Sequence, residues 1–130
     1  MRWPSKQALP GGWAGQRVLI TGASGGIGYA LAEALAQRGA HLVISGRKPE
    51  VLALLVNRFP EQMVAVAADL TRAEERHRLV SATHLAGCNM LINAAGNNQQ
   101  GFFDTTTDSD IEQLVAINLT ATLQLTQALL

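Results

Sequence analysis

Thr21-Gly22-Ala23-Ser24-Gly25-Gly26-Ile27-Gly28, residues 21–28, follows the apolar run Val18-Leu19-Ile20 and precedes an alanine-rich stretch with a helical pattern. Glycines let the backbone turn tightly out of a strand and let a ligand approach the main chain closely. The free N–H groups and the positive dipole end of the following helix favour an anionic group. In this context the stretch predicts a site for the pyrophosphate of a dinucleotide, and the alternative is a glycine-rich turn without a ligand. The candidate cofactor-binding residues of the turn are Gly22, Ser24, Gly26, Ile27 and Gly28.

The rest of the chain alternates apolar runs with helical patterns. Strands are expected at 17–20, 42–45, 63–67 and 90–92, and helices at about 26–38, 49–58, 71–83 and from 109 to the chain end. The last two helices are expected to open with capping boxes, Thr71 with Glu74 and Ser109 with Glu112. Because the strands lack polar alternation, they are typical of a parallel sheet covered on both faces.

We therefore expect an α/β fold, a doubly wound parallel sheet of the Rossmann type. The sheet is expected to be incomplete, with four strands in the order 3-2-1-4. In that order the strand at 90–92 lies on an uncovered edge and the last helix leaves an apolar face bare, so the chain is expected to associate or aggregate.

Composition limits the possible classes of protein. With 130 residues, 48% of them apolar, the chain can bury one core, so we expect one partial dinucleotide-binding domain at 12–130 after a flexible extension at 1–11. Ten basic and ten acidic residues argue against a nucleic-acid partner. No apolar stretch suits a membrane span or a signal peptide, and the single cysteine, Cys88, fits a reducing compartment, so a cytoplasmic protein is expected. The three histidines show no metal-ligand spacing, and no metal site is expected.

The end of the second expected strand indicates which cofactor is preferred. A domain selective for NAD usually places a carboxylate there, on the adenosine ribose hydroxyls. This chain instead reads Ser45-Gly46-Arg47-Lys48. The guanidinium of Arg47 suits the oxygens of a 2′-phosphate, so NADP(H) is favoured over NAD(H). Alternatively, Arg47 and Lys48 are solvated charges that precede a helix.

These motifs resemble, in order and spacing, those of the short-chain dehydrogenase/reductase family, over about residues 12–130. Gly22, Gly26 and Gly28 match its G-x-x-x-G-x-G turn, although Gly25 also allows the G-x-x-G-x-x-G turn of the epimerase-like branch. The stretch at 93–96, Asn-Ala-Ala-Gly, is similar to the family's N-N-A-G and favours the compact branch. Its second Asn is replaced by Ala94, which puts local stability in doubt.

The resemblance implies further roles. Asp69 would accept a hydrogen bond from the adenine amino group, with Leu70 contributing its backbone, unless Asp69 only marks the entry of a helix beside Thr71. Asn93, Ala95 and Gly96 would bring the backbone close to the adenosine ribose. Asn118 would hold a water against the catalytic lysine of an Asn, Ser, Tyr, Lys proton relay; read from its apolar helix alone, it would be a satisfied polar group in the core.

The resemblance also implies what this sequence lacks. The family's catalytic Ser and Tyr-x-x-x-Lys have no match here: the single tyrosine is Tyr29, and the only lysines are Lys6 and Lys48. We therefore expect the N-terminal half of an NADP(H)-dependent oxidoreductase acting on a small carbonyl or alcohol substrate. By itself it should bind cofactor poorly and transfer no hydride. The alternative is a non-catalytic dinucleotide sensor or scaffold subunit, and the complete enzyme is expected to be a homodimer or homotetramer.

Overall fold

The structure, a computed structural model, describes residues 11–130; the expected flexible extension thus lies, except for Gly11, outside the described residues. The strands are β1 (Arg17–Thr21), β2 (His41–Gly46), β3 (Met63–Ala67) and β4 (Met90–Asn93). The helices are α1 (Gly26–Gln37), α2 (Pro49–Arg58), α3 (Ala73–Leu85), α4 (Asp108–Val115) and α5 (Ala121–Leu129). A 3-10 turn, η1 (Phe103–Thr105), precedes α4, and a π-helical turn, η2 (Ala116–Thr120), joins α4 to α5.

The four strands form one parallel sheet in the order β3-β2-β1-β4, which confirms the expected Rossmann-type fold. Ile20 of β1 pairs with Ile44 of β2 on one side and with Ile92 of β4 on the other. Within the described part of the chain β4 is an edge strand, as expected.

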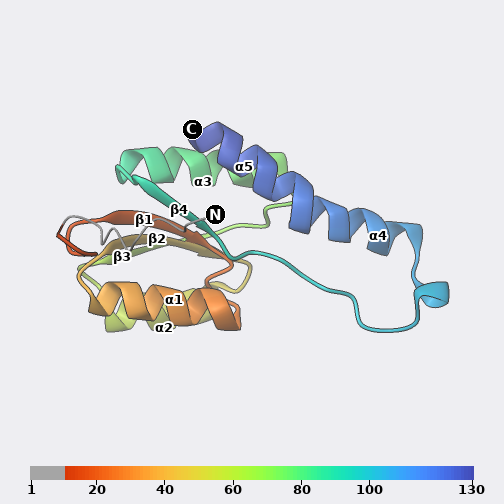
Figure 1. The fold of residues 1–130 in the computed structure, drawn as a ribbon, viewed down its shortest axis with the longest axis horizontal. Coiled ribbons are helices and arrows are strands. Elements are labelled where there is room, and N and C mark those ends of the chain that lie inside the picture. Colours follow the sequence, from red (N-terminus) through yellow and green to blue (C-terminus); the bar gives the residue numbers. More distant parts are fainter. Residues whose placement is uncertain (1–10) are drawn as a thin grey trace, which may run out of the picture.

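Two helical layers cover the sheet (Figure 1): α1 and α2 lie on one face, and α3 and α5 on the other. Successive strand residues point to opposite faces. Val18, Ile20 and Ile44 accordingly belong to the core beside α1 and α2. Leu19 and Val43 belong to the second core, together with buried residues of α3 and α5. This alternation also tells which face of the sheet each residue near the carboxyl end of a strand points to.

The first two helices begin and end as the sequence predicts. After α1, Gly39 adopts the left-handed conformation with φ +88°, which closes a helix at little steric cost to glycine. Pro49 occupies the first turn of α2, where its missing N–H removes no helical hydrogen bond.

Both predicted capping boxes are wrong. The Thr71 hydroxyl donates to Asp69 Oδ1 at 2.7 Å, and α3 begins later, after Arg72, without a side-chain cap. In α4 the capping box is formed by Thr107 and Asp110, two residues earlier than the predicted Ser109 and Glu112. In α4 an acidic residue follows three positions after both Thr107 and Ser109, so both registers have the spacing of a capping box.

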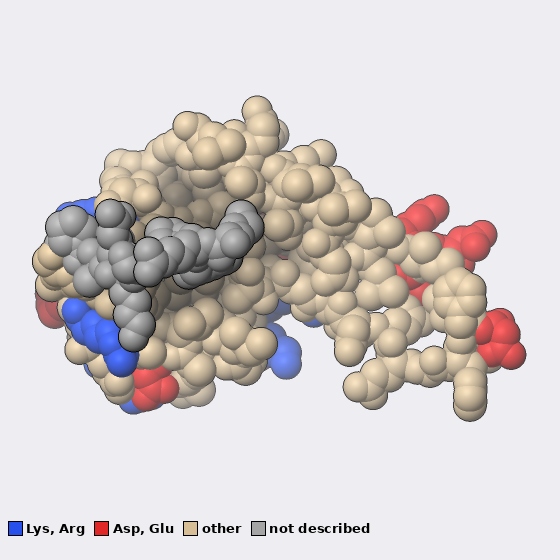
Figure 2. Space-filling view, viewed as in Figure 1, with Lys and Arg blue, Asp and Glu red and all other residues tan. Residues whose placement is uncertain are grey.

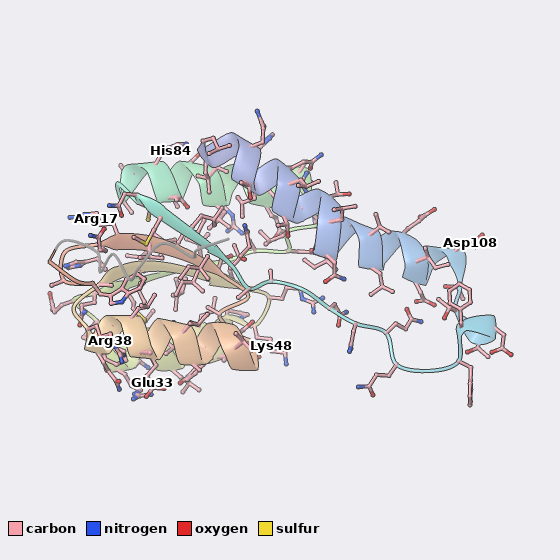
Figure 3. The ribbon with its side chains drawn as sticks, in the orientation of Figure 1. Arg17, Glu33, Arg38, Lys48, His84 and Asp108 are labelled. Carbon is pink, nitrogen blue, oxygen red and sulfur yellow. The ribbon has the colours of Figure 1, made fainter. Side chains whose placement is uncertain are left out.

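The segment from Gly96 to α4 projects from the body of the molecule (Figures 1 and 2), and acidic side chains gather at its far end, where Figure 3 labels Asp108. No residue of α4 is buried. The last helices expose Val115, Leu119 and Leu123 while burying Ala121 and Leu125, so the expected bare apolar face is present. Within residues 11–130, every helix is too short or too polar to span a bilayer.

Candidate functional site

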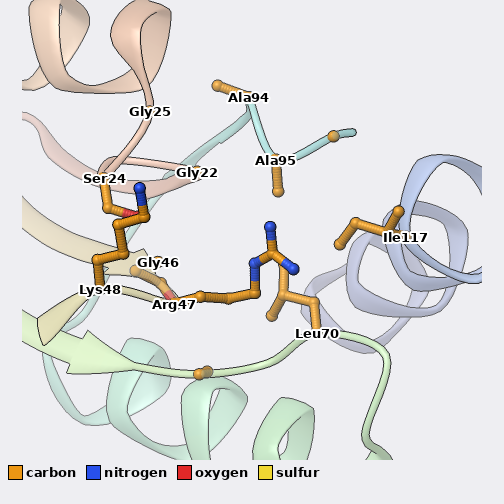
Figure 4. Close-up of a pocket in the computed structure, with 13 residues that line it drawn as sticks. Gly22, Ser24, Gly25, Gly46, Arg47, Lys48, Leu70, Ala94, Ala95 and Ile117 are labelled. Atoms are coloured by element: carbon orange, nitrogen blue, oxygen red, sulfur yellow. The ribbon is translucent and has the colours of Figure 1, made fainter. Parts of the chain in front are cut away.

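A cavity of about 180 Å³ opens at the carboxyl edge of the sheet (Figure 4). The segments that follow all four strands contribute to it, and η2 closes one side. The lining residues are Gly22, Ser24, Gly25, Ser45, Gly46, Arg47, Lys48, Ala68, Leu70, Ala94, Ala95, Gly96 and Ile117. Ligands of open α/β sheets bind at this edge, which makes the cavity the candidate site.

The glycine turn after β1 allows three backbone segments to meet. Gly22 has φ +68°, and a Cβ added there would lie 2.5 Å from the carbonyl oxygen of Ala94 at the end of β4. A Cβ on Gly28 would collide with the carbonyl oxygen of Gly22. Only glycine fits at both positions without displacing the turn. Gly25 precedes α1 as its N-cap and supplies no side-chain cap, so no side chain caps the amides of the first turn.

Gly26 and Ile27 open α1 beside the cavity rather than in its wall. A Cβ on Gly26 would meet no atom within 4 Å, so this glycine is not required by packing within the chain. Ile27 is 76% exposed, although it is apolar. Both residues are positioned at the helix terminus that would receive an anion.

At the end of β2 the chain excludes a carboxylate and supplies two cations. A Cβ on Gly46 would overlap Ser24 Oγ and lie 3.0 Å from the backbone nitrogen of Ser24. Any larger side chain at Gly46 would therefore have to displace Ser24. Figure 4 shows the next two residues leaving the strand in different directions, Arg47 towards Leu70, Ala95 and Ile117, and Lys48 towards Ser24.

Asp69 lies in a neighbouring hollow of about 310 Å³, which shares Arg47 and Ile117 with the main cavity. Its Oδ1 accepts hydrogen bonds from the Thr71 backbone N at 3.0 Å and from the Thr71 hydroxyl at 2.7 Å. The Thr71 hydroxyl is the largest cause of a pKa for Asp69 below the ordinary carboxyl value, and the charge of Arg47 acts in the same direction. Asp69 therefore makes the contact expected of a helix-entry residue, while its role towards adenine stays a prediction.

Asn118 connects the π-helical turn to the loop after β4. Its Nδ2 donates to the Asn97 carbonyl at 2.7 Å, and its Oδ1 accepts from the Asn97 backbone N at 3.0 Å. A Cβ on Gly96 would lie 2.8 Å from Asn118 Oδ1, so glycine permits this close approach. The amide of Asn118 is thus satisfied by backbone groups, and its role in a proton relay stays a prediction.

Threonines hold the last residue of β4 and the loop that follows it. Asn93 Nδ2 donates to Thr126 Oγ1 of α5 at 3.2 Å. The backbone N of Ala95 donates to the buried Thr21 hydroxyl at 3.2 Å, which ties β4 to the end of β1. This bond connects neighbouring strands at the place where Ala94 departs from the family pattern.

The cavity brings together part of the predicted set: Gly22, Ser24, Arg47, Leu70, Ala95 and Gly96 line it. Gly26, Ile27, Gly28, Asp69, Asn93 and Asn118 lie outside its lining. The structure adds Ser45, Gly46 and Lys48, which belong to the tetrapeptide that the sequence had singled out. Ala68 and Ile117 carried no chemical signal, because alanine and isoleucine at such positions are ordinary core residues.

Two other kinds of chemistry find little support in the described residues. Residues 11–130 contain no cluster of three His, Cys, Asp or Glu side chains able to hold a metal ion. Cys88 is half-buried, and burial raises the pKa of its thiol, which disfavours the reactive thiolate.

Comparison with known proteins shows what this arrangement is similar to. The family model for short chain dehydrogenase matches residues 16–130. A curated 3-oxoacyl-[acyl-carrier-protein] reductase from Rickettsia bellii is 36% identical over 107 residues, which cover 82% of this chain and 44% of that protein. The chain thus spans about half the length of the curated relatives it matches: 44% of this reductase, and 48% of a nodulation protein G from Rhizobium sp. (strain N33), to which it is 34% identical over 117 residues, or 88% of this chain.

Solved structures agree with this assignment. A short-chain dehydrogenase from Sphingobium yanoikuyae in complex with NADPH is 37% identical, with a TM-score of 0.77 over 88% of this chain and 47% of that one. A 3-ketoacyl-(acyl-carrier-protein) reductase from Brucella melitensis complexed with NADH is 25% identical, with a TM-score of 0.83 over 91% of this chain and 50% of that one. Similar folds therefore bind either nicotinamide dinucleotide.

Proposed function

This chain belongs to the short-chain dehydrogenase family, and on that premise we propose that it binds the adenosine half of NADP(H) for an oxidoreductase that acts on a small carbonyl or alcohol. The observation that carries the proposal is the cavity at the carboxyl edge of the sheet, where the glycine turn, the cations after β2 and the small residues after β4 meet.

The glycine turn fits the pyrophosphate of such a cofactor. Gly22 and Gly28 keep the turn free of side chains, and the first turn of α1 presents backbone N–H groups without a side-chain cap. Its dipole adds a favourable interaction with negative charge. When bound, the cofactor would supply or accept the hydride, and this chain's part is to hold and orient it.

The preference for NADP(H) rests on Gly46 and Arg47. Gly46 leaves no carboxylate to bind the ribose hydroxyls or to repel a phosphate, and its contact with Ser24 opposes a larger residue. Arg47 supplies the fork of donors that suits a phosphate monoester, and Lys48 adds a second charge on the same cavity. NAD(H) is the alternative cofactor.

None of the residues that line the cavity can act as the tyrosine that donates the proton in the family's mechanism. Tyr29 packs beside the core on the α1 face and does not line the cavity. We accordingly propose that these 130 residues, tested alone, bind cofactor weakly and transfer no hydride. The alternative, a non-catalytic dinucleotide sensor or scaffold, shares the binding site and would differ in that the full-length protein also lacks turnover.

The exposed apolar residues Val115, Leu119 and Leu123 support a further part of the proposal, that the complete protein is a homo-oligomer. Exposed apolar surface of this kind commonly marks an interface. In the family this helix packs between subunits.

Binding of two small ligands tests the proposed function without the nicotinamide half. Adenosine 2′,5′-bisphosphate carries the 2′-phosphate, and 5′-AMP lacks it. Both dissociation constants are measured by calorimetry for the wild type, for Arg47→Ala, and for Arg38→Ala, which removes an equal charge at the opposite end of α1.

We expect Arg47→Ala to lower the affinity for adenosine 2′,5′-bisphosphate by about 10- to 100-fold, since a hydrogen bond to a charged group contributes about 1.5–3 kcal/mol. The affinity for 5′-AMP should stay unchanged, and Arg38→Ala should alter neither ligand. Failure of the wild type to bind either ligand would refute the proposed site, and equal loss in both variants would refute the role of Arg47.

A further inference from the structure

Ser45 lies at the carboxyl end of β2 and lines the cavity, yet its hydroxyl has no assigned role. The residue is 1% exposed. Among the described residues, Ser45 Oγ is a buried side-chain oxygen with no hydrogen-bond partner. Native proteins pair almost all buried polar groups, so an unpaired hydroxyl at a cavity wall calls for an explanation.

Strand alternation determines which way this side chain points. Ile44 belongs to the core beside α1 and α2, so Ser45 points to the opposite face, as Val43 does. On that face Leu70, Ala95 and Ile117 pack together, and all three also line the cavity. The side chain of Ser45 therefore points towards the part of the cavity that these apolar residues line.

The backbone around Ser45 is fixed independently of its hydroxyl. The Ser45 carbonyl accepts a hydrogen bond from the Ala23 backbone N at 2.8 Å, which joins the end of β2 to the glycine turn. The strand itself pairs with both β1 and β3. The side chain is thus held at the wall without contributing a bond to the fold.

The surroundings indicate which part of a dinucleotide would meet this hydroxyl. The phosphates and the ribose would lie towards the glycine turn and Lys48, while the Arg47 guanidinium extends towards Leu70, Ala95 and Ile117 (Figure 4), where it can stack on a ring as well as bind a phosphate. The apolar side, between Leu70, Ala95 and Ile117, suits a flat ring. A purine carries acceptor nitrogens on its edge, and a serine hydroxyl can rotate to donate to one of them.

We infer that Ser45 is a cofactor-binding residue whose Oγ donates a hydrogen bond to a ring nitrogen of the adenine base. This inference rests on the proposed function, because it concerns the same cavity. It adds a specific contact for the base, separate from the contacts of Arg47 with phosphate and of Asp69 with the amino group.

The test compares Ser45→Ala with the wild type and with Thr83→Val, a matched control. Thr83 is 3% exposed, and its hydroxyl donates to the Leu79 carbonyl within α3, away from the cavity. Each protein is titrated with adenosine 2′,5′-bisphosphate and with ribose 2,5-bisphosphate, which has no base. The melting temperature of each ligand-free protein is measured as well.

We expect Ser45→Ala to lower the affinity for adenosine 2′,5′-bisphosphate by about three- to tenfold, which corresponds to the loss of one neutral hydrogen bond. Its affinity for the base-free ligand and its melting temperature should not fall, because the hydroxyl is unpaired in the free protein. Thr83→Val should leave both affinities unchanged.

Unchanged affinity of Ser45→Ala for the base-containing ligand would overturn the inference, as would an equal loss for both ligands together with a lower melting temperature. Those results leave the proposed function intact, because the wild type still binds. Failure of the wild type to bind the base-containing ligand would instead refute the proposed function and the inference with it.

Discussion

Gly28→Ala tests the packing that shapes the glycine turn. In most helix positions this change stabilises a protein by about 0.5–1 kcal/mol, because alanine loses less conformational freedom on folding. Here the new Cβ would collide with the Gly22 carbonyl oxygen, and would lie 2.6 Å from the Gly22 carbonyl carbon and 3.0 Å from Ala23 Cα. Both neighbours are backbone, so the turn itself must move. Overpacking of this kind costs about 1–3 kcal/mol, so the net loss of stability relative to the wild type lies between about 0 and 2.5 kcal/mol.

Gly26→Ala provides the matched control in the same helix. A Cβ there meets no atom within 4 Å, so the free energy of unfolding should stay constant or rise slightly. Urea unfolding followed by circular dichroism gives the free energy of unfolding and the m-value of each protein. We expect Gly28→Ala to lower the midpoint without a change in m-value. If Gly28→Ala is as stable as Gly26→Ala, the reasoning from the turn geometry is wrong.

Two further predictions follow from hydrogen bonds of the described residues. Thr107→Ala should accelerate amide exchange in α4 by about 2- to 30-fold, because a lost N-cap costs about 0.5–2 kcal/mol. Ser109→Ala, at the cap position that the sequence suggested, should leave the exchange rates unchanged. Faster exchange in Ser109→Ala and not in Thr107→Ala would show that the predicted register is correct. The pKa of Asp69 is lowered in the folded protein, so its contribution to stability is full above the unfolded value near 3.8 and is lost as the pH falls through the lower folded pKa. As the pH falls below about 4, the free energy of unfolding should therefore decrease less steeply for Asp69→Asn than for the wild type. Urea unfolding between pH 3 and 6 measures this dependence, and the same pH dependence in both proteins would contradict the role of the Thr71 hydrogen bonds.

The sequence predicted the fold well because the signals that specify it are local. Apolar runs without polar alternation marked the strands, and Gly39 and Pro49 marked helix boundaries through their own backbone preferences. The predicted start of α4 failed for the opposite reason. Thr107 and Ser109 are both competent caps with an acidic residue three positions later, but the backbone is extended at Thr107 and already helical from Asp108.

The sequence by itself determined the glycine turn and the tetrapeptide at 45–48, because each depends on residue type at a fixed spacing along the chain. The sheet order followed from the doubly wound fold that the alternation of strands and helices indicated. Only the tertiary structure decided how individual side chains are satisfied. In the structure Asn118 donates a hydrogen bond to the backbone of Asn97, Asp69 accepts one from Thr71, and Ser45 Oγ has no partner. Hydrogen bonds of this kind depend on distances between segments that are remote in the sequence, and a spacing pattern carries no information on those distances.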